Sequence, residues 1–465
     1  MKLTVQLIIE PGDGSTVVTE VATLEREALT EATLGLTLAE SKTILGGVQE
    51  TIVAQQVASD RSAQQTCPAC GASRRRKGQH QIVVRSLFGT LRLESPRFRR
   101  CACQSVDDPR SSSPLAERLP QRTTPERRYL EAKWAALLPF GVTVDVLEEV
   151  LPLQARVATV YRHTQQVAER LENELGDEQP FFIEGCQRDW NALPRPDGPL
   201  TVGIDGGYVH ARDGDNRKAG WFELIVGKSV PTDGSAKCFG FVTSYDTKPK
   251  RRLAELLKAQ GLQMNQAITF LSDGGDNVRD LQLYLSPLAE HLLDWFHITM
   301  RITVMRQQLK ELIATAPNHD LAKLDDELER IKWYLWHGNV FQALQEIEHV
   351  GWELEDLDEE APASRKLAKS VAEFHSYIEA NEAFIPNYGD RYRYGEVIST
   401  AFVESTVNQV VSKRFVKKQQ MRWTKRGAHM LLQVRAQVLN EDLRPSFERW
   451  YPAMTSTDVS QALAA

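Results

Sequence analysis

The chain has 465 residues, of which 42% are hydrophobic and 25% charged, and its formal net charge is −6. One hydrophobic core rarely serves so long a chain, so we expect three or four folded units. No run of about eighteen apolar residues occurs, which excludes a membrane-spanning helix. The N-terminus lacks a secretory cleavage site, so we expect a cytoplasmic protein whose six cysteines are not paired as disulfides.

Charge is distributed unevenly along the chain. Residues 74–100 contain nine Lys or Arg and one acid, and residues 412–426 contain seven basic residues and no acid. Residues 346–360 contain eight acids and no Lys or Arg. Such segregation favours basic surfaces that face an anionic partner, although a solvated helix face without any partner is the alternative for each cluster.

The first unit, residues 1–60, shows alternating apolar residues over 3–9 and 16–22 and helical spacing over 38–57. These patterns predict two strands and an amphipathic helix. Nothing catalytic is evident in this part, which we interpret as a packing or dimerisation element.

Residues 61–110 contain two cysteine pairs, Cys67 with Cys70 and Cys101 with Cys103, on either side of a predicted hairpin over 81–98. Two cysteine knuckles around a hairpin are typical of a zinc ribbon, in which four thiolates satisfy the tetrahedral preference of Zn²⁺. The second pair has one intervening residue where two are usual, and unrelated reduced thiols are the alternative. Phosphate contact is the expected role of the basic residues on this ribbon, namely Arg74, Arg75, Arg76, Lys77, Arg97, Arg99 and Arg100.

Residues 111–178 show helical periodicity that is interrupted near Pro139 and Pro152, which predicts three helices. On the last helix Val157, Val160 and Val167 are expected to face inward. Arg156, Thr159, Arg162, His163 and Gln166 are expected to face outward. A turn before a helix with such residues resembles a helix-turn-helix that binds the DNA major groove, with Arg156 and Arg162 as DNA contacts. A plain helical bundle is the alternative.

Three short β-branched and aromatic runs between residues 200 and 244 predict an antiparallel meander, and Asp205 lies inside the first run. A carboxylate at such a position needs a partner, for which a metal ion is suitable. A helix, a strand that ends at Asp273, another helix and a short apolar run at 290–298 follow. This order is that of an RNase H-like fold, where the first and fourth strands are neighbours and Asp205 would lie beside Asp273.

A third acid is expected from a helix, and Glu404 lies in one whose buried stripe is Val403, Val407, Val410 and Val411. This spacing puts Asn408 beside Glu404 on the edge of the helix. The basic residues that follow are expected to contact phosphates, namely Lys413, Arg414, Lys417 and Lys418.

Competing interpretations exist for each of these acids. Asp205 and Asp273 both precede glycines and are compatible with ordinary turns. Asp213, Asp215 and Asp276 compete for the aspartate positions, and Glu396 for the glutamate position. His297 is either a core histidine or a residue that orders the site.

In their strand, strand and helix contexts, Asp205, Asp273 and Glu404 resemble the acidic triad of the DDE transposases of bacterial insertion sequences. The run from Asp294 to His297 resembles the Asp/Cys-x-x-His element of the Mutator-related branch, in which a helical insertion precedes the glutamate. Two further features are similar to those of ISKra-type transposases. One is a zinc ribbon that precedes a helix-turn-helix-like region. The other is the order of residues near the C-terminus, namely Glu404, Asn408, Lys413-Arg414, Met421-Arg-Trp423 and Gly427.

The resemblance implies a multidomain α+β protein. Its parts would be an N-terminal element (1–60), a zinc ribbon (61–110), a helix-turn-helix-like domain (111–178), an RNase H-like catalytic domain (179–299 and 391–450), an all-α insertion (300–390) and a tail (451–465). Most of the aromatic residues of the insertion are expected in its own core, and a minority could stack on bases.

The resemblance also implies a bacterial, nucleoid-associated enzyme that binds terminal inverted repeats and target DNA as a homodimer or higher oligomer. Asp205 and Asp273 would hold one Mg²⁺ or Mn²⁺, and Asp205 and Glu404 a second. Asp294, His297 and Asn408 would support the site, and Zn²⁺ would be structural. The alternatives are a metal-dependent nuclease or resolvase of the same fold, and a DNA-binding regulator without catalysis.

Overall fold

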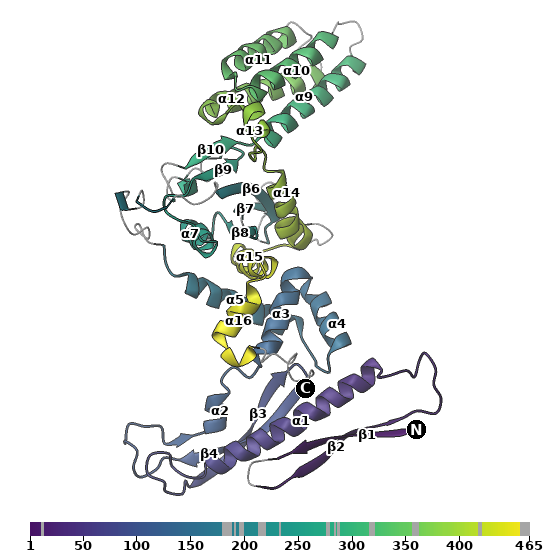
Figure 1. Cartoon of the computed structure of the whole chain (residues 1–465), viewed down its shortest axis with the longest axis vertical. Helices are drawn as coiled ribbons and strands as arrows, with labels where there is room; N and C mark the ends of the chain where they lie inside the picture. The colour runs from purple at the N-terminus through teal and green to yellow at the C-terminus, as the bar shows by residue number, and fades with distance from the viewer. Residues whose placement is uncertain are drawn as a thin grey trace. The chain divides into compact units, whose positions relative to one another are not determined.

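The computed structural model describes residues 1–10, 14–178, 188–189, 192–194, 200–212, 220–231, 234–275, 280–282, 285, 289–315, 321–355, 362–416 and 421–455 (Figure 1). These residues form a mixed α+β protein with three β-sheets and many helices. Two compact units are present, residues 1–168 with 441–465, and residues 169–440. Within the described ranges, none of the helices has the length and apolarity needed to cross a bilayer.

The first unit begins with an antiparallel pair, β1 (Lys2–Ile9) and β2 (Val17–Glu25), followed by the long helix α1 (Leu38–Ala63), as the sequence predicts. A capping box fixes the start of α1. The Glu40 N–H donates to Thr37 Oγ1 at 3.2 Å, and the Thr37 N–H donates to Glu40 Oε2 at 2.9 Å.

The predicted hairpin is present as β3 (Arg76–Ser86) and β4 (Gly89–Arg99), and β5 (Ser111–Ser112) adds a short third strand to the sheet. The helix α2 (Pro114–Arg118) contributes Leu115 to a small core with residues of β3 and β4. This sheet supports the segments that hold the four cysteines.

The three predicted helices are α3 (Pro125–Leu137), α4 (Phe140–Val150) and α5 (Val157–Leu175). The sequence prediction that Val157 faces inward is wrong, because Val157, the first residue of α5, is 49% exposed. The prediction that His163 faces outward is also wrong. His163 is buried, and its Nδ1 forms a hydrogen bond with Glu131, which also accepts a hydrogen bond from Arg127 Nε at 2.8 Å. The ion-paired Glu131 gives the imidazole a polar partner inside the core.

The C-terminal end of the described chain belongs to the first unit, whereas the sequence assigns residues up to 450 to the catalytic domain. Its elements are α16 (Leu443–Trp450) and the short 3₁₀ helix η3 (Pro452–Met454). The Phe447 ring packs edge-on against Tyr129 of α3, with 5.4 Å between ring centroids, and Arg444 forms an ion pair with Glu126 at 2.8 Å.

The second unit contains a five-stranded sheet in the order β10-β9-β6-β7-β8. Its strands are β6 (Leu200–His210), β7 (Trp221–Val230), β8 (Lys237–Val242), β9 (Ile268–Ser272) and β10 (Glu290–Leu293). The first three strands are antiparallel, β9 runs parallel to β6, and β10 runs parallel to β9. The predicted meander and the predicted neighbourhood of the first and fourth strands are therefore confirmed.

Helices cover both faces of this sheet (Figure 1). Leu200, Val202 and Ile204 of β6 form a core with Leu253 and Leu257 of α7 (Pro249–Ala259). The opposite face is covered by α14 (Ala401–Val407) and α15 (Lys425–Leu439). Successive residues of a strand point to opposite faces, so the odd-numbered residues of β6 face α14.

The predicted helical insertion comprises α9 (Trp295–Thr315), α10 (Ala322–Trp336), α11 (Val340–Glu355) and α12 (Pro362–Ala380), followed by η1 (Glu382–Phe384) and α13 (Tyr388–Arg393). The insertion has its own apolar core, to which Tyr334, Trp336, Phe374 and Tyr377 contribute. Trp333 and Trp352 are exposed instead, so most but not all of the aromatic residues are internal.

Candidate active site and metal-binding clusters

The register of the sheet aligns the two candidate aspartates. Gly203 of β6 pairs with Leu271 of β9, and two residues further along each parallel strand are Asp205 and Asp273. Asp205 is half-buried inside β6, and Asp273 is exposed immediately after β9 ends. Asp205, in the middle of β6, is therefore in register with Asp273 at the carboxyl end of the adjacent parallel strand β9, and such strand ends are a common location for ligand sites in open sheets.

The surroundings of Asp205 disfavour its negative charge. Burial raises the pKa of Asp205, and repulsion by Asp273 and Asp294 adds to this. Two groups lower the pKa of Asp205: the Gly206 N–H, which donates to its Oδ1 at 2.7 Å, and the nearby His297. Burial and repulsion outweigh them, so the pKa is raised overall. A bound cation would remove this imbalance.

Asp294 joins three elements near this pair. Its side chain is fully buried, and its Oδ1 accepts N–H groups from Phe296 at 2.9 Å and from Thr400 at 2.8 Å. Its Oδ2 interacts with His297 Nδ1 at 2.6 Å and accepts the Thr400 hydroxyl. Burial alone would raise the pKa of Asp294, but these hydrogen bonds outweigh it, and the pKa is lowered.

The sequence predicts one apolar run over 290–298, but the strand ends at Leu293 and α9 begins at Trp295. Asp294 lies at the junction between β10 and α9, and His297 lies three residues later, in the first turn of α9. Burial lowers the pKa of His297, yet the hydrogen bond to Asp294 and the charges of Asp294, Asp205 and Asp273 raise it overall. This geometry favours a role for His297 in ordering the site over that of an ordinary core histidine.

Helix α14 packs on the strand that carries Asp205. A Cβ atom on Gly203 would lie 2.2 Å from Val403 Cγ2, and one on Gly207 would lie 3.4 Å from Val407 Cγ1. Asp205 lies between these glycines on the same face of β6. Glu404 follows Val403 directly in this helix and is exposed.

The three acids do not form a compact single-ion site. Among the described residues, Asp205, Asp273 and Glu404 are not a group whose ligand atoms all lie within 4.8 Å of one another. A two-ion site has a different requirement, because its ions lie about 3.5–4 Å apart and only neighbouring acids share an ion. Carboxylate oxygens are the donors that Mg²⁺ and Mn²⁺ prefer, so the residue types fit such ions.

After α14 the chain continues as a π-helix, η2 (Asn408–Val416), an uncommon form that often marks functional sites. Lys413 is exposed, and Asn408 is half-buried at the junction. The predicted phosphate contact by Arg414 is contradicted, because this side chain is fully buried and its guanidinium lies 5.4 Å from the centroid of the Trp423 ring. Burial lowers the pKa of Arg414 to about 9. Lys417 and Lys418 lie outside the described residues.

Of the competing acids, Asp213, Asp215 and Asp276 also lie outside the described residues. Glu396 forms an ion pair with Arg391 at 2.7 Å, and Arg391 in turn pairs with Glu290. This cation neutralises Glu396, which makes it a poor candidate for an ion-binding acid.

The four cysteines of the first unit form a cluster whose sulfur atoms all lie within 4.8 Å of one another. Cys67 and Cys103 Sγ are 3.6 Å apart, as are Cys70 and Cys101 Sγ. Four sulfurs at about 2.3 Å from a tetrahedral Zn²⁺ would be about 3.8 Å apart, so the donor set fits that ion. The Ala69 and Cys70 N–H groups lower the pKa of Cys67 to about 6, which favours a thiolate.

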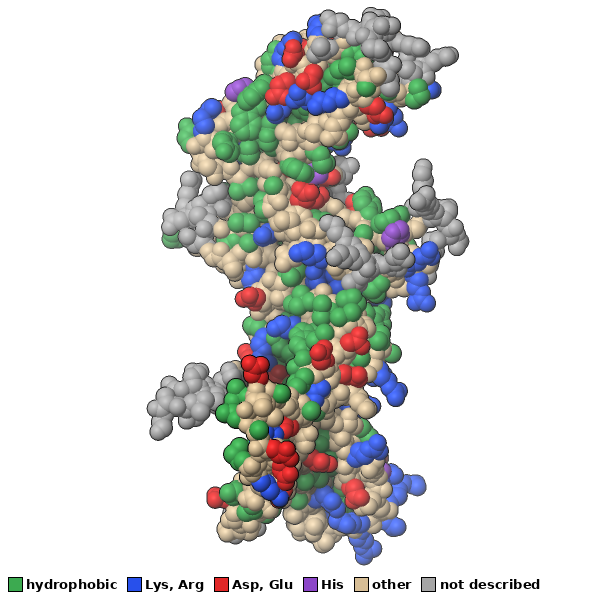
Figure 2. Space-filling model, turned by 90° about the vertical axis from the view of Figure 1, so that its right-hand side faces the viewer, with side chains coloured by type: hydrophobic (Ala, Val, Ile, Leu, Met, Phe, Trp, Pro, Cys, Tyr) green, Lys and Arg blue, Asp and Glu red, His purple; other side chains and the backbone are tan. Residues whose placement is uncertain are grey.

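Basic residues are close in sequence to both cysteine pairs, and Figure 2 shows Lys and Arg gathered near the lower end of the view, the part where Figure 1 draws β1 to β4 and α1. Arg75, Arg76, Lys77, Arg97 and Arg99 are exposed and therefore accessible to a phosphate, whereas Arg100 is half-buried and its Nη1 donates to the carbonyl oxygens of Ser105 and Asp108.

Arg74 differs from these neighbours, because it is half-buried over the Phe98 ring, and its Nη2 donates to Ser112 Oγ at 2.7 Å. On α5, Arg162 is exposed, and Arg156 is exposed just before the helix begins.

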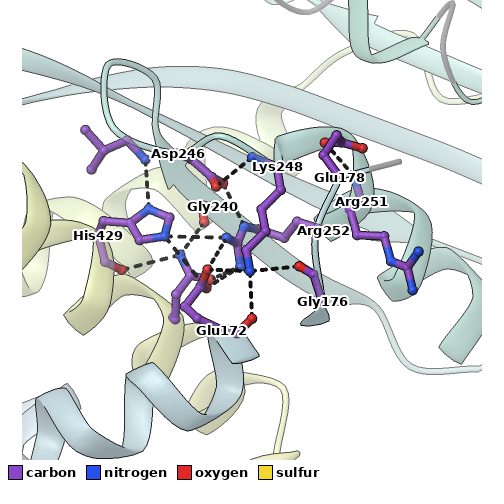
Figure 3. A network of polar contacts seen from close by, with 11 residues as sticks. Glu172, Gly176, Glu178, Gly240, Asp246, Lys248, Arg251, Arg252 and His429 are labelled. Carbon is purple, nitrogen blue, oxygen red and sulfur yellow. Dashed lines mark hydrogen bonds and ion pairs between the residues drawn. The ribbon is translucent and has the colours of Figure 1, made fainter. Parts of the chain in front are cut away.

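A second acidic cluster, Glu172 with Asp246 and His429, also has ligand atoms within 4.8 Å of one another (Figure 3). Arg252 already occupies its centre. The guanidinium donates to both oxygens of Glu172 at 2.9 and 3.1 Å and to Asp246 Oδ2 at 3.0 Å, and a further hydrogen bond of 2.6 Å joins it to Gln433. We call Arg252 and its partners Glu172, Asp246, His429 and Gln433 the Arg252 network. It needs no metal, because a protein cation neutralises its acids.

Sequence reasoning missed two contributors to the candidate active site. Thr400, the residue before α14, holds Asp294 through its N–H and hydroxyl, and a threonine before a helix is a usual N-cap signal. Gly203 allows α14 to approach β6, and a glycine inside an apolar strand is a signal for close approach.

No protein-family model matches the chain, and no curated protein matches its sequence. A solved structure described as the crystal structure of NurA is similar over 55% of this chain and 73% of its own, with 14% sequence identity and a TM-score of 0.11. A similarity with so low a TM-score carries no argument about function.

Proposed function

We propose that this protein is a DDE-type DNA transposase of an insertion sequence, related to the ISKra group, and that its second unit is an RNase H-like catalytic domain. The observation that carries the proposal is the alignment of Asp205 with Asp273 on adjacent parallel strands, next to the helix that bears Glu404. The strand order β8-β7-β6-β9-β10, with three antiparallel strands and two parallel ones, further supports it.

Asp205 and Asp273 would hold one Mg²⁺ or Mn²⁺, and Asp205 and Glu404 a second. When bound, such ions activate the attacking water or 3′-hydroxyl and stabilise the leaving oxygen of an in-line displacement. The four cysteines, Cys67, Cys70, Cys101 and Cys103, would hold a structural Zn²⁺.

The chain's own residues orient these acids. Asp294 binds the start of α9 through Phe296 and the start of α14 through Thr400, so it fixes the helix that carries Glu404. His297 is held by Asp294, and the charges of Asp294, Asp205 and Asp273 raise its pKa; in its protonated form it would restrain the repulsion between Asp205 and Asp273 before DNA binds. Loss of Asp294 should therefore disturb the geometry of the site without removing a ligand.

DNA would be bound through the exposed basic residues of the ribbon, through Arg156 and Arg162, and through Lys413. These side chains are available to phosphates of terminal inverted repeats and target DNA. The exposed Trp333 and Trp352 of the insertion offer stacking surfaces for unpaired bases near the ends. Two ends must be paired during transposition, so we expect at least a homodimer on DNA.

The test is strand cleavage of a plasmid that carries the sequences flanking the gene, followed by strand transfer from precleaved ends. Wild-type protein should carry out both steps with Mg²⁺ or Mn²⁺. Asp205→Asn, Asp273→Asn and Glu404→Gln should lose both steps while retaining DNA binding.

Glu396→Gln is the matched control, because Glu396 is a nearby acid that Arg391 neutralises, and it should retain activity. Cleavage without transfer by the wild type would indicate a nuclease. The proposed site would be rejected if all three variants cleaved DNA as well as the wild type does.

A further inference from the structure

The helical insertion contains a third cluster of potential ligands, far along the chain from the acids discussed above. Glu327 of α10 and His349 and Glu353 of α11 have ligand atoms that all lie within 4.8 Å of one another. His349 and Glu353 are four residues apart, so both project from the same face of α11. The cluster therefore connects two neighbouring helices.

Glu327 is the unusual member of this cluster. Its side chain is only 2% exposed, and its Oε2 atom is buried and forms no hydrogen bond among the described residues. The ring nitrogen Nδ1 of His349 lies 3.7 Å from this atom. A buried carboxylate oxygen without a hydrogen bond is costly, and an ion or a water is the usual explanation.

The imidazole of His349 lies between two carboxylates. Its Nδ1 is 3.7 Å from Glu327 Oε2, and its Nε2 is 3.7 Å from Glu353 Oε1. Both distances exceed those of hydrogen bonds. Ligand atoms bonded to a tetrahedral Zn²⁺ at about 2.0–2.2 Å lie about 3.3–3.5 Å apart, so a shift of a few tenths of an ångström would bring a donor pair into range.

We infer that Glu327, His349 and Glu353 form a binding site for a divalent transition-metal ion such as Zn²⁺, separate from the cysteine cluster. One imidazole and two carboxylates supply three ligands of types that bind zinc, and three protein ligands with water in the remaining position are typical of open zinc sites. Bound there, the ion satisfies Glu327 Oε2 and links α10 to α11.

Lys323 currently competes for this position. Its Nζ lies 2.6 Å from Glu353 Oε1 and 3.4 Å from Glu327 Oε1, so it partly neutralises both acids. Its side chain is 59% exposed and can turn into solvent when a metal ion binds. Removal of this competing cation should therefore strengthen metal binding.

The test measures Zn²⁺ bound per chain by equilibrium dialysis and elemental analysis of the full-length protein. His349→Ala and Glu353→Gln should each bind one Zn²⁺ fewer than the wild type. His349 is 47% exposed, so its substitution should leave the fold intact, which circular dichroism would verify. Lys323→Met should bind this ion several-fold more tightly.

His375→Ala is the matched control, because this histidine also lies near two glutamates, Glu348 at 3.4 Å and Glu379 at 3.9 Å, but is not part of a three-residue ligand cluster among the described residues. It should leave the zinc content unchanged. The site would be rejected by equal zinc content in wild type and His349→Ala, or by unchanged or weaker binding in Lys323→Met. Substitution of Cys101 and Cys103 together tests the cysteine cluster independently.

Discussion

The second unit contains two groups of acidic side chains that differ in how their charge is balanced. In the Arg252 network, Glu172 and Asp246 surround a guanidinium that donates to both (Figure 3). Asp205 inside β6 and Asp273 just after β9 repel each other, and the nearby His297 is hydrogen-bonded to Asp294. The first group is neutralised by the protein itself, whereas the second remains short of positive charge.

This difference separates an acidic cluster that stabilises the fold from one suited to bind a cation. Both groups combine acids with a histidine, His429 in the first and His297 in the second. The presence of Arg252 distinguishes them, because an ion pair that is fully hydrogen-bonded leaves no ligand atom for a metal. The depressed pKa of Glu172 and the raised pKa of Asp205 express the same contrast.

The largest expected effect comes from Asp205→Asn. We expect strand cleavage to fall by at least about 10³-fold, equivalent to about 4 kcal/mol of activation free energy. Thermal stability should be unchanged or slightly higher, because the substitution removes a charge that burial and repulsion disfavour. Cleavage assays and thermal denaturation of the same preparation test this. A large loss of stability would show that the charge of Asp205 stabilises the fold, which is contrary to the comparison above.

Arg252→Met should have the opposite effect on stability, which should decrease. It leaves Glu172 and Asp246 buried without their cation, which typically costs about 3–5 kcal/mol. The melting temperature of the second unit should fall clearly. Arg251→Met is the control, because Arg251 is the neighbouring residue and pairs with the more exposed Glu255 at 3.2 Å. Equal stability of the two variants would show that the network does not stabilise the fold.

Glu172→Gln should change the response of stability to pH. Burial raises the pKa of Glu172, but hydrogen bonds and charges from His429 and Arg252 outweigh it and lower the pKa from 4.5 to about 2. The stabilisation is therefore present above about pH 4.5, where it is worth up to about 3 kcal/mol, and is lost as the pH falls toward 2. The melting temperatures of wild type and Glu172→Gln should differ at pH 7 and converge in acid. A constant difference would contradict this assignment.

A smaller effect is expected on the basic surface of the first unit. Arg75→Gln should weaken DNA binding and reduce the slope of log affinity against log salt by about 0.9, because one phosphate contact is lost. Arg414→Gln should leave this slope unchanged, since the Arg414 side chain is buried. Affinity measured by fluorescence anisotropy at several salt concentrations tests both, and an altered slope in Arg414→Gln would contradict its burial.

Sequence patterns were sufficient to predict the strands of the central sheet, the neighbouring positions of β6 and β9 and the helical insertion, because these depend on local periodicity and on the order of elements. His163 and Arg414 were misassigned for a common reason. Val160 and Val167 flank His163, and Val410 and Val411 precede Arg414, at spacings that put both on a buried stripe, yet their polarity suggested the surface.

Their burial depends on partners outside their own helices, Glu131 for His163 and Trp423 for Arg414. The same limit applies to the candidate site. Asp205, Asp273 and Glu404 were recognisable from their strand and helix contexts, whereas the contact of Asp294 with Thr400 and the pairing of Arg252 with Glu172 join residues 106 and 80 positions apart. No local pattern encodes such contacts.

The most direct test of the central proposal is the binding of Mn²⁺ to the protein with cleaved-end DNA, measured in a His349→Ala background so that the insertion cluster does not contribute. We predict that this protein binds Mn²⁺, and that Asp205→Asn and Asp273→Asn each abolish tight binding while DNA affinity is retained. Mn²⁺ binding of undiminished affinity in both variants would contradict the assignment of these aspartates as the metal-binding acids.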